Sequence, residues 1–317
     1  MSAQPNTSPA PQPFIKTLHA ENFRCLRDVT VDFAPLTILV GPNASGKSTI
    51  LEALQHRYIF AHEDRWQRSP DLHPRLHLLS SWGPNADINE ISEPGGKLHW
   101  ESQLIRLDAR ELRKPNQASN ASRLSTYGEN LTNLFASLSR RQQGELVKQF
   151  QRLVPALQDI NDVPFQAGTL ELRFTDAWNE ALVYKPEEVS DGTMFVLAFL
   201  CLQYQSQPPD ILLIEEPERG LHPYLMEQVM RLLRALAHGE LGPKAVQVVM
   251  ATHSAELLEY ARPEEVRFVN RRREDGATTV YAPDVNSESW RDIFDVYENS
   301  MSGLWLSGTA GGVPGRS

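Results

Sequence analysis

A run of eight residues near the N-terminus has the residue types and spacing of a phosphate-binding loop. It fits the pattern G-x-x-x-x-G-K-[S/T] and reads Gly41, Pro42, Asn43, Ala44, Ser45, Gly46, Lys47 and Ser48. The glycines let successive backbone N–H groups curl around a phosphate, and a helix that starts here directs its positive end at the same anion. Lys47 would supply a charge to the β- and γ-phosphates, and the Ser48 hydroxyl is suited to Mg²⁺.

The sequence around this loop favours nucleotide binding over the alternative, a strand-to-helix turn that binds nothing. The apolar run 36–40 predicts a buried strand, and a helix is expected after the loop. The residues expected to contact the nucleotide are Gly41, Asn43, Ala44, Ser45, Gly46, Lys47, Ser48 and Thr49. Thr49 is expected as a helix residue rather than as a second metal ligand, and Lys47 is also a candidate catalytic residue.

Two adjacent carboxylates follow a second apolar run, 211–214. Glu215 and Glu216 end this predicted strand, and neighbouring residues of a strand point in opposite directions. We therefore assign Glu215 to the metal and Glu216 to the water that attacks the γ-phosphate, as general base or positioning group. Taken alone, such a pair is usually a solvated strand end. A phosphate loop in the same chain favours the functional interpretation.

Two further sites could contact phosphate. His253 follows the apolar run 246–251 and is a candidate contact for the γ-phosphate, although a lone histidine at a strand end usually forms ordinary surface hydrogen bonds. Ser190 opens an apolar helix, so its hydroxyl and the first backbone amides form an anion site without a cation. The alternative for Ser190 and Gly192 is a simple helix cap.

The segments between these motifs predict one large α/β domain with an insertion. Residues 1–13 are rich in Pro, Ser and Gln and predict a disordered lead. Strand-like patterns run from 14 to 40, whereas 61–170 loses clear periodicity and then shows helical stretches, which predicts an inserted lobe. The last residues, 301–317, are expected to be a flexible or partner-docking tail, although within them the apolar segment 302–308 favours packing back onto the core over docking a partner.

Composition limits the classes of function. The chain has 317 residues, with 31 basic and 40 acidic side chains and a formal charge of −9, so any DNA contact must come from local basic patches such as 271–273 or 140–141. Cys25 and Cys201 lack the spacing of a zinc site or disulfide framework, which favours the cytoplasm. The longest apolar stretch, 194–202, is far shorter than the ~20 residues that cross a membrane.

With these motifs in hand, the sequence resembles the ABC-type ATPases of the SMC, RecF and OLD branch, most closely the small bacterial members without a long coiled coil. The resemblance covers 14 to about 270 and rests on the opening at 15–24, the phosphate loop, the signature-like run 190–193, the Glu215–Glu216 pair and His253. It implies an α/β P-loop ATPase head with a mixed central sheet, an N-terminal antiparallel β-subdomain and an inserted mostly helical lobe. The single domain would span 14–300, with the lobe at about 61–170.

The resemblance also implies ATP, Mg²⁺ and a head-to-tail dimer. In such a dimer Ser190 and Gly192 of one subunit touch the γ-phosphate held by Lys47 and Ser48 of the other. The run 218–223 matches the loop that meets the partner subunit, and His253 matches the switch histidine of the family.

Two features depart from the family pattern. The family usually has Asp where Glu215 stands, which predicts a longer or water-bridged contact to the metal. The lid glutamine has two candidates, Gln55 and Gln67, and the sequence does not choose between them.

Three classes of function fit these motifs. The first is an ATPase subunit of a DNA-directed system, such as phage defence or repair, in which ATP-driven dimer closure gates a separate effector such as a nuclease. A separate chain is expected because the roughly sixty residues after His253 are too few for the Toprim domain of OLD nucleases. The second is a self-sufficient RecF-like DNA-binding clamp. The third, a transporter nucleotide-binding subunit, is disfavoured because 190–193 lacks the transporter form of the signature. The choice between ATP and GTP stays open.

Overall fold

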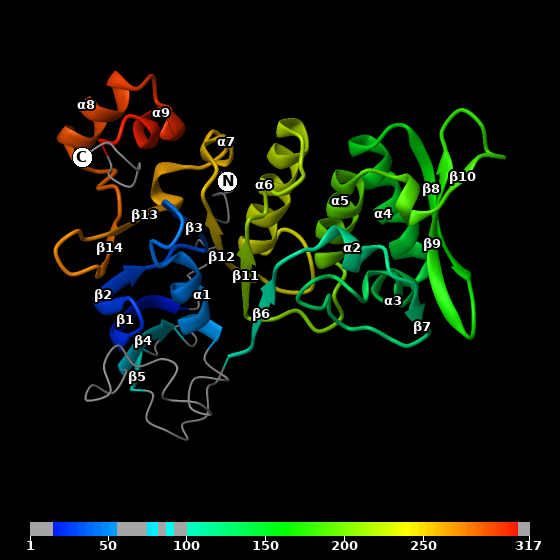
Figure 1. The fold of residues 1–317 in the computed structure, drawn as a ribbon, viewed down its shortest axis with the longest axis horizontal. Coiled ribbons are helices and arrows are strands. Elements are labelled where there is room, and N and C mark those ends of the chain that lie inside the picture. Colours follow the sequence, from blue (N-terminus) through cyan, green and yellow to red (C-terminus); the bar gives the residue numbers. More distant parts are fainter. Residues whose placement is uncertain (1–14, 56–74, 82–86, 92–99, 310–317) are drawn as a thin grey trace, which may run out of the picture.

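A computed structural model of the chain describes residues 15–55, 75–81, 87–91 and 100–309. The predicted lead 1–13 and the lid candidate Gln67 lie outside these residues. Figure 1 shows an elongated molecule, with two sheets and the C-terminal helices at one end and a lobe of helices and short strands at the other.

The central element is a six-stranded sheet with the order β14-β13-β3-β12-β11-β6. Its strands are β3 (Leu36–Val40), β6 (Ser102–Ile105), β11 (Ile211–Glu215), β12 (Gln247–Thr252), β13 (Val266–Arg271) and β14 (Thr278–Tyr281). All neighbouring pairs are parallel except β13 and β14. Every residue of β3 and β12 is buried, as continuous apolar runs predict for strands that are covered on both faces. The expected mixed central sheet is confirmed.

A second, antiparallel sheet has the order β2-β1-β4-β5 and confirms the expected N-terminal β-subdomain. Its strands are β1 (Ile15–Phe23), β2 (Leu26–Asp32), β4 (Arg75–Ser81) and β5 (Asp87–Ile91). Helix α1 (Lys47–Gln55) packs beside it, and Ile50, Leu51 and Leu54 are buried in one apolar cluster with residues of both sheets. This packing fixes the helix that begins at the phosphate loop.

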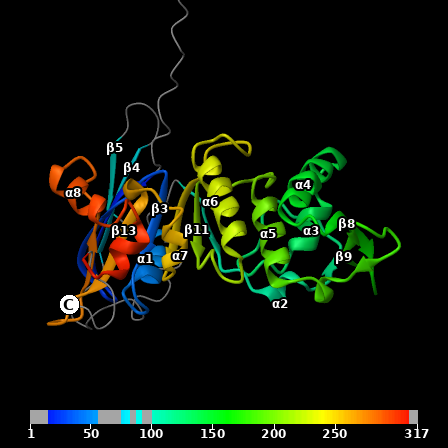
Figure 2. The same ribbon diagram turned by 90° about the horizontal axis from the view of Figure 1, so that it is seen from above.

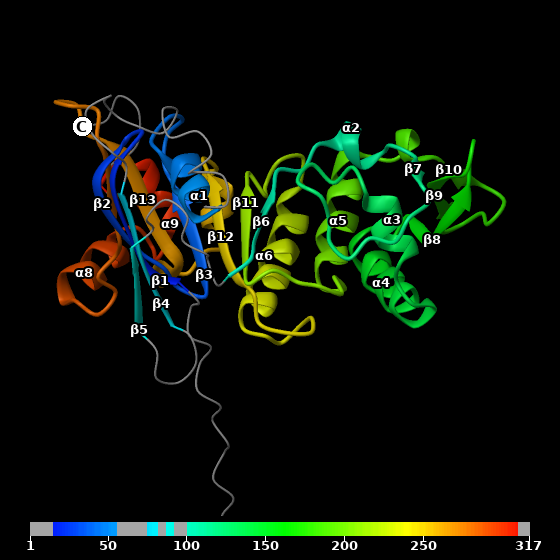
Figure 3. The ribbon, with the colours of Figure 1, turned by 90° about the horizontal axis from the view of Figure 1, so that it is seen from below.

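The lobe lies on the far side of β11 and β6. Its elements are α2 (Ala109–Leu112), β7 (Asn116–Gln117), α3 (Leu131–Ala136), α4 (Arg140–Leu153), β8 (Leu157–Pro164), β9 (Thr169–Asp176), β10 (Val183–Tyr184), η3 (Pro186–Glu188) and α5 (Asp191–Leu202). Figures 1, 2 and 3 agree that α6 (Pro223–Ala237) lies next to β11, that α5 follows it, and that α3, α4 and the small sheet lie farther out. Helix α5 is buried from Gly192 to Leu202, which explains its continuous apolar sequence.

The lobe differs from the predicted insertion at about 61–170. Strands β4 and β5 within that range pair into the N-terminal sheet, and β6 forms the edge of the central sheet. The described lobe therefore begins after β6 and continues beyond 170 through β9, β10 and η3. Their pairing is set by distant strands, which local periodicity does not reveal.

The C-terminal segment folds back onto the core. After α7 (Ala255–Leu258), η4 (Pro263–Glu265) and α8 (Glu288–Val296), helix α9 (Met301–Leu306) packs against α7. Met301, Leu304 and Trp305 are buried there, so the prediction of a flexible or partner-docking tail is wrong for this helix. Their i, i+3, i+4 spacing forms one apolar helix face, and residues 310–317 lie outside the described part. Within the described ranges, no helix has the length and apolar character to cross a bilayer.

Candidate nucleotide-binding site

The phosphate loop connects the end of β3 to the start of α1, as expected. Ala44 and Gly46 have φ angles of 61° and 114°, in the left-handed region, and Ser45 N donates to Pro42 O over 3.2 Å. Gly41 needs its lack of a side chain for another reason: a Cβ there would lie 2.0 Å from the backbone oxygen of Val269 on β13. The loop is therefore held tightly between neighbouring elements.

Lys47 folds over this loop. Its Nζ donates to the backbone oxygens of Gly41 and Pro42 over 2.7 and 2.8 Å. Burial lowers the pKa of Lys47 from its ordinary value of 10.5, and the charges of nearby carboxylates, first Glu216 and then Glu218 and Glu215, act in the opposite direction. The ammonium therefore lies within electrostatic reach of the acidic residues that follow β11.

The other predicted loop residues differ in exposure. Asn43, Ala44 and Ser48 are exposed, whereas Ser45 and Gly46 are buried. Thr49 is 9% exposed, and its Oγ1 lies 3.5 Å from the Cys25 Sγ. Its predicted contact with nucleotide stays a prediction.

The strand ends bring two predicted catalytic residues into contact. Glu215 pairs with Ala251 across β11 and β12, and Glu216 N donates to Ala251 O over 2.9 Å. Glu216 then turns out of the strand with a φ of 48°. Its Oε1 lies 3.2 Å from the Nδ1 of His253, which follows the end of β12. Both side chains are about half exposed, so the pair can reach a ligand.

Arg106 is a site residue that the sequence did not reveal. It directly follows β6, the strand paired with β11, and holds the carboxylate of Glu215. Its Nε lies 2.6 Å from Oε2, and one terminal nitrogen donates to Oε1 over 2.8 Å. Burial opposes the charge of Arg106, but the hydrogen bond and charge of Glu215 prevail and raise its pKa above the ordinary value. The sequence offered one signal for this residue: Arg106 directly follows the short apolar run Leu104-Ile105, as a polar residue at a strand end does.

Glu218, expected only as part of the loop that meets the partner subunit, also makes contacts at the site within its own chain. Burial raises its pKa, against the hydrogen bond that Thr252 Oγ1 donates to its Oε1 over 2.6 Å. Its other carboxylate oxygen is buried without a hydrogen-bond partner in the described chain. The Thr252 hydroxyl also accepts from Ser254 N over 2.9 Å. Glu218 thus ties the loop after β11 to the segment that carries His253.

The signature-like run begins α5, as predicted, but lies away from the phosphate loop of its own chain. Ser190 is exposed at the N-cap, where its Oγ accepts from Thr193 N over 3.2 Å. A Cβ on Gly192 would lie 2.9 Å from Gly220 O, so the start of α5 lies against the loop after β11. Helices α5 and α1 stand apart in Figures 1 and 2, with β11 and α6 between them.

The residues present fit a nucleotide with a metal ion. In the described part of the chain, no group of three or more His, Cys, Asp or Glu side chains could hold a metal by itself. Mg²⁺ in nucleotide sites commonly takes one or two protein oxygens and completes its shell with phosphates and water. Ser48 and Glu215 could supply such oxygens. The buried Ser45 Oγ, which has no partner in the described chain, is a further unused polar atom in the loop.

Comparison with protein families identifies the chain. Residues 61–259, more than half of the sequence, match the family described as "AAA domain, putative AbiEii toxin, Type IV TA system". The chain belongs to this family. The phosphate loop lies before the matched region, so the loop and the match are independent observations.

Local sequence matches and fold similarity agree with this AAA-domain assignment. An OLD nuclease of Thermus scotoductus is 52% identical over 40 residues, and the DNA replication and repair protein RecF of Thermosynechococcus vestitus is 54% identical over 43 residues. These matches cover 13% of this chain and only 8% and 11% of those proteins.

Two solved structures share the fold. An SMC head bound to the C-terminal winged-helix domain of ScpA has a TM-score of 0.59 at 15% identity, covering 86% of this chain and 98% of that one. A Pyrococcus furiosus SMC head with an extended coiled coil, bound to the C-terminal domain of ScpA, has a TM-score of 0.50 at 13% identity and covers 90% and 100%. The chain shares the α/β fold of these SMC heads, which agrees with the resemblance to the SMC, RecF and OLD branch that the sequence motifs indicated.

Proposed function

We propose that this AAA-domain protein binds ATP with Mg²⁺ and hydrolyses it between two subunits. One observation carries the proposal: the phosphate loop, the Glu215–Glu216 pair and His253 follow three neighbouring strands, and Glu216 Oε1 lies 3.2 Å from His253 Nδ1. In a parallel sheet the carboxyl ends of the strands share one edge, where ligands bind.

Each residue has a role that its position allows. The loop amides and Lys47 bind the β- and γ-phosphates, and Ser48 and Glu215 hold Mg²⁺, which neutralises phosphate charge when it is bound. Glu216 orients the attacking water and accepts its proton. His253 contacts the γ-phosphate and holds the Glu216 carboxylate in place.

The position of Ser190 supports the proposed dimer. Ser190 is exposed at the start of the long helix α5, whose N-terminal end attracts an anion, but the phosphate loop of the same chain lies elsewhere, at the start of α1. We infer that a second copy supplies the phosphate, with Ser190 and Gly192 contacting its γ-phosphate. The loop containing Gly220 would then lie at the subunit boundary, because it packs against Gly192.

We further propose that ATP-driven closure gates a DNA-directed process, such as phage defence or repair, through a separate effector. The local matches to an OLD nuclease and to RecF support a role on DNA. The SMC heads with this fold are bound to domains of another protein, ScpA, which supports a separate partner.

The test is the molecular mass of Glu216→Gln with ATP and Mg²⁺, measured by light scattering beside the wild type. Removal of the general base should slow hydrolysis by roughly 10²–10⁴-fold and trap the closed dimer. Ser190→Arg in the same background should return it to a monomer. A Glu216→Gln protein that binds ATP but stays monomeric would exclude the two-subunit site.

A self-sufficient RecF-like clamp remains the second candidate. Its support is the RecF match and the exposed residues Arg271, at the end of β13, and Arg272 and Arg273, which follow it. Stimulation of ATP hydrolysis by DNA in the isolated chain, lost in Arg271→Gln/Arg273→Gln, would favour it.

A further inference from the structure

We propose that the guanidinium of Arg106 occupies the carboxylate of Glu215, the expected metal ligand, until nucleotide binds. Mg²⁺ must then displace Arg106 from this carboxylate. The inference rests on the proposed nucleotide site. It adds that Arg106 controls how strongly nucleotide affinity depends on Mg²⁺. Arg106 would thereby be a positioning residue, because it acts through Glu215 and not on the phosphates.

The ion pair occupies both carboxylate oxygens. Nε of Arg106 lies 2.6 Å from Oε2 of Glu215, and a terminal nitrogen donates to Oε1 over 2.8 Å. The terminal nitrogen makes a hydrogen bond, whereas Nε is close enough for an ion pair but is not aligned for a hydrogen bond. Mg²⁺ needs at least one of these oxygens, so the metal and Arg106 compete for the same group.

The pair remains accessible to a competing ion. The Arg106 and Glu215 side chains are 32% and 19% exposed, unlike the Arg234–Glu265 pair, whose side chains are 15% and 6% exposed. A partly solvated ion pair is weaker than one held in a dry core, because water screens the charges. Exchange of the guanidinium for a divalent ion is therefore feasible without unfolding.

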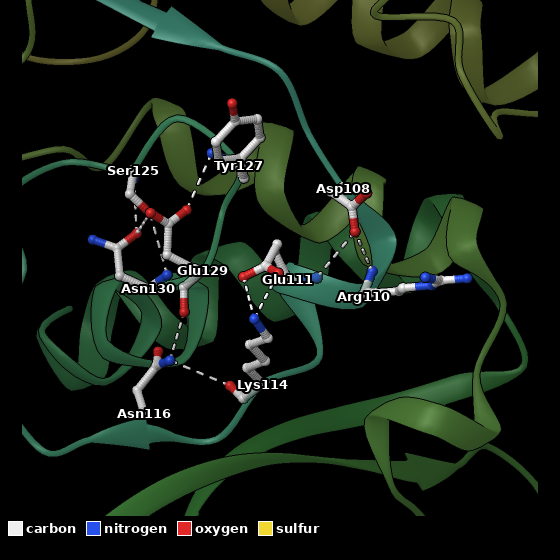
Figure 4. Close-up of polar contacts among 9 residues, drawn as sticks. All are labelled: Asp108, Arg110, Glu111, Lys114, Asn116, Ser125, Tyr127, Glu129 and Asn130. Carbon is white, nitrogen blue, oxygen red and sulfur yellow. Dashed lines mark hydrogen bonds and ion pairs between the residues drawn. The ribbon is translucent and has the colours of Figure 1, made fainter.

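The backbone of Arg106 is fixed, so displacement involves the side chain. Its N–H donates to Thr126 O over 2.7 Å, and Asp108 N donates to Tyr127 O over 3.2 Å. Figure 4 shows how the following segment is tied down: Asp108 Oδ1 caps α2 by accepting from Arg110 N and Glu111 N. Displacement of Arg106 would therefore move its side chain while these backbone hydrogen bonds stay in place.

The charge of a second carboxylate, Glu52, also acts on Arg106. Glu52 of α1 also contributes to the raised pKa of Arg106, which shows that its charge acts on the guanidinium. Glu52 already pairs with Arg24 over 2.5 Å, and burial raises its own pKa.

The experiment compares binding of a fluorescent ribose-labelled ATP analogue in EDTA and in excess Mg²⁺. Without Arg106, Glu215 repels metal-free nucleotide, whereas Mg²⁺ no longer has a competitor. The ratio of the two dissociation constants in Arg106→Gln should therefore rise about tenfold over the wild type, while Arg106→Lys keeps the cation and stays near the wild-type ratio. In Arg106→Gln/Glu215→Gln the rise should disappear.

Arg123→Gln is the control, because Arg123 also pairs with a glutamate, Glu101, and its own side chain is 27% exposed, close to the 32% of Arg106. It should leave the ratio unchanged. An equal loss of affinity in EDTA and Mg²⁺, or a smaller ratio, in Arg106→Gln would overturn the inference and indicate a purely structural ion pair. Arg106→Met replaces Arg106→Gln if the latter does not fold. A wild type that binds the analogue in neither condition would instead refute the proposed nucleotide site.

Discussion

Lys47 lies at a site where burial favours its neutral form over its charged form. Its Nζ is held by two backbone oxygens of the loop, and burial lowers its pKa from 10.5 despite nearby carboxylates. In the unfolded chain this lysine has its ordinary, higher pKa. The charged lysine therefore lowers the free energy of unfolding below the lowered pKa, and this loss of stability decreases as the pH rises from the lowered pKa towards 10.5. A bound phosphate would reverse the balance, because it favours the charged form.

The first prediction is a pH dependence of ATP affinity that belongs to Lys47. Affinity should be constant near neutral pH and fall as pH rises through the lowered pKa towards 10.5, because binding then requires uptake of a proton. Titration with a fluorescent ATP analogue at several alkaline pH values measures this. Lys47→Arg stays charged throughout and should lose the dependence, so equal slopes for both proteins would assign it to another group.

At the scale of elements, the start of α5 and the loop after β11 support each other through glycines. Gly220 has a φ of 71°, and a Cβ there would lie 2.6 Å from a ring carbon of Phe195 on α5. Gly192 meets the same loop from the helix side, where a Cβ would lie 2.9 Å from Gly220 O. The close approach holds Ser190 in a fixed place relative to the carboxylate strand.

The second prediction separates this contact from simple backbone strain. Gly276→Ala is the matched control, since Gly276 has a φ of 64° and nothing within 4 Å of an added Cβ. Gly276→Ala and Gly220→Ala should each lower the free energy of unfolding by roughly 1 kcal/mol, because both glycines have a left-handed backbone. Gly220→Ala should lower it by roughly a further 1–3 kcal/mol, because the new methyl group is too close to Phe195. Urea unfolding measures the free energy of unfolding of both variants. Equal losses in Gly220→Ala and Gly276→Ala would show that Phe195 makes room for the new methyl group without loss of stability.

The elements also explain what could be predicted from the sequence. Strands β3, β11 and β12 were expected because burial on both faces produces continuous apolar runs, and the residues after them were then natural candidates. Strand β6 was missed because four residues within an irregular stretch have no periodicity of their own. Arg106 was missed with it, since its partner Glu215 comes from a strand 109 residues away.

At the scale of the whole molecule, the central sheet joins two apolar clusters. Leu36 and Ile38 of β3 face a cluster that extends through α5 to Leu146 of the lobe. Leu39 of the same strand belongs to the other cluster, with Leu18 of the N-terminal sheet. Lobe and sheets therefore share a continuous interior through the strand that carries the phosphate loop, and we propose that they form a single domain.

The last prediction is that the chain unfolds as one cooperative unit. Calorimetric and van't Hoff enthalpies should agree, and circular dichroism and tryptophan fluorescence should report the same transition. Leu146→Ala in the lobe and Leu18→Ala in the N-terminal sheet both shorten fully buried side chains. Each should lower the free energy of unfolding of the whole chain by roughly 2–5 kcal/mol. Because the two substitutions lie in different clusters, an independent lobe would give two transitions, with Leu146→Ala lowering only one. That outcome would mean that the signature serine can move with the lobe while the phosphate loop stays folded, and dimer closure could then proceed without strain in the sheet.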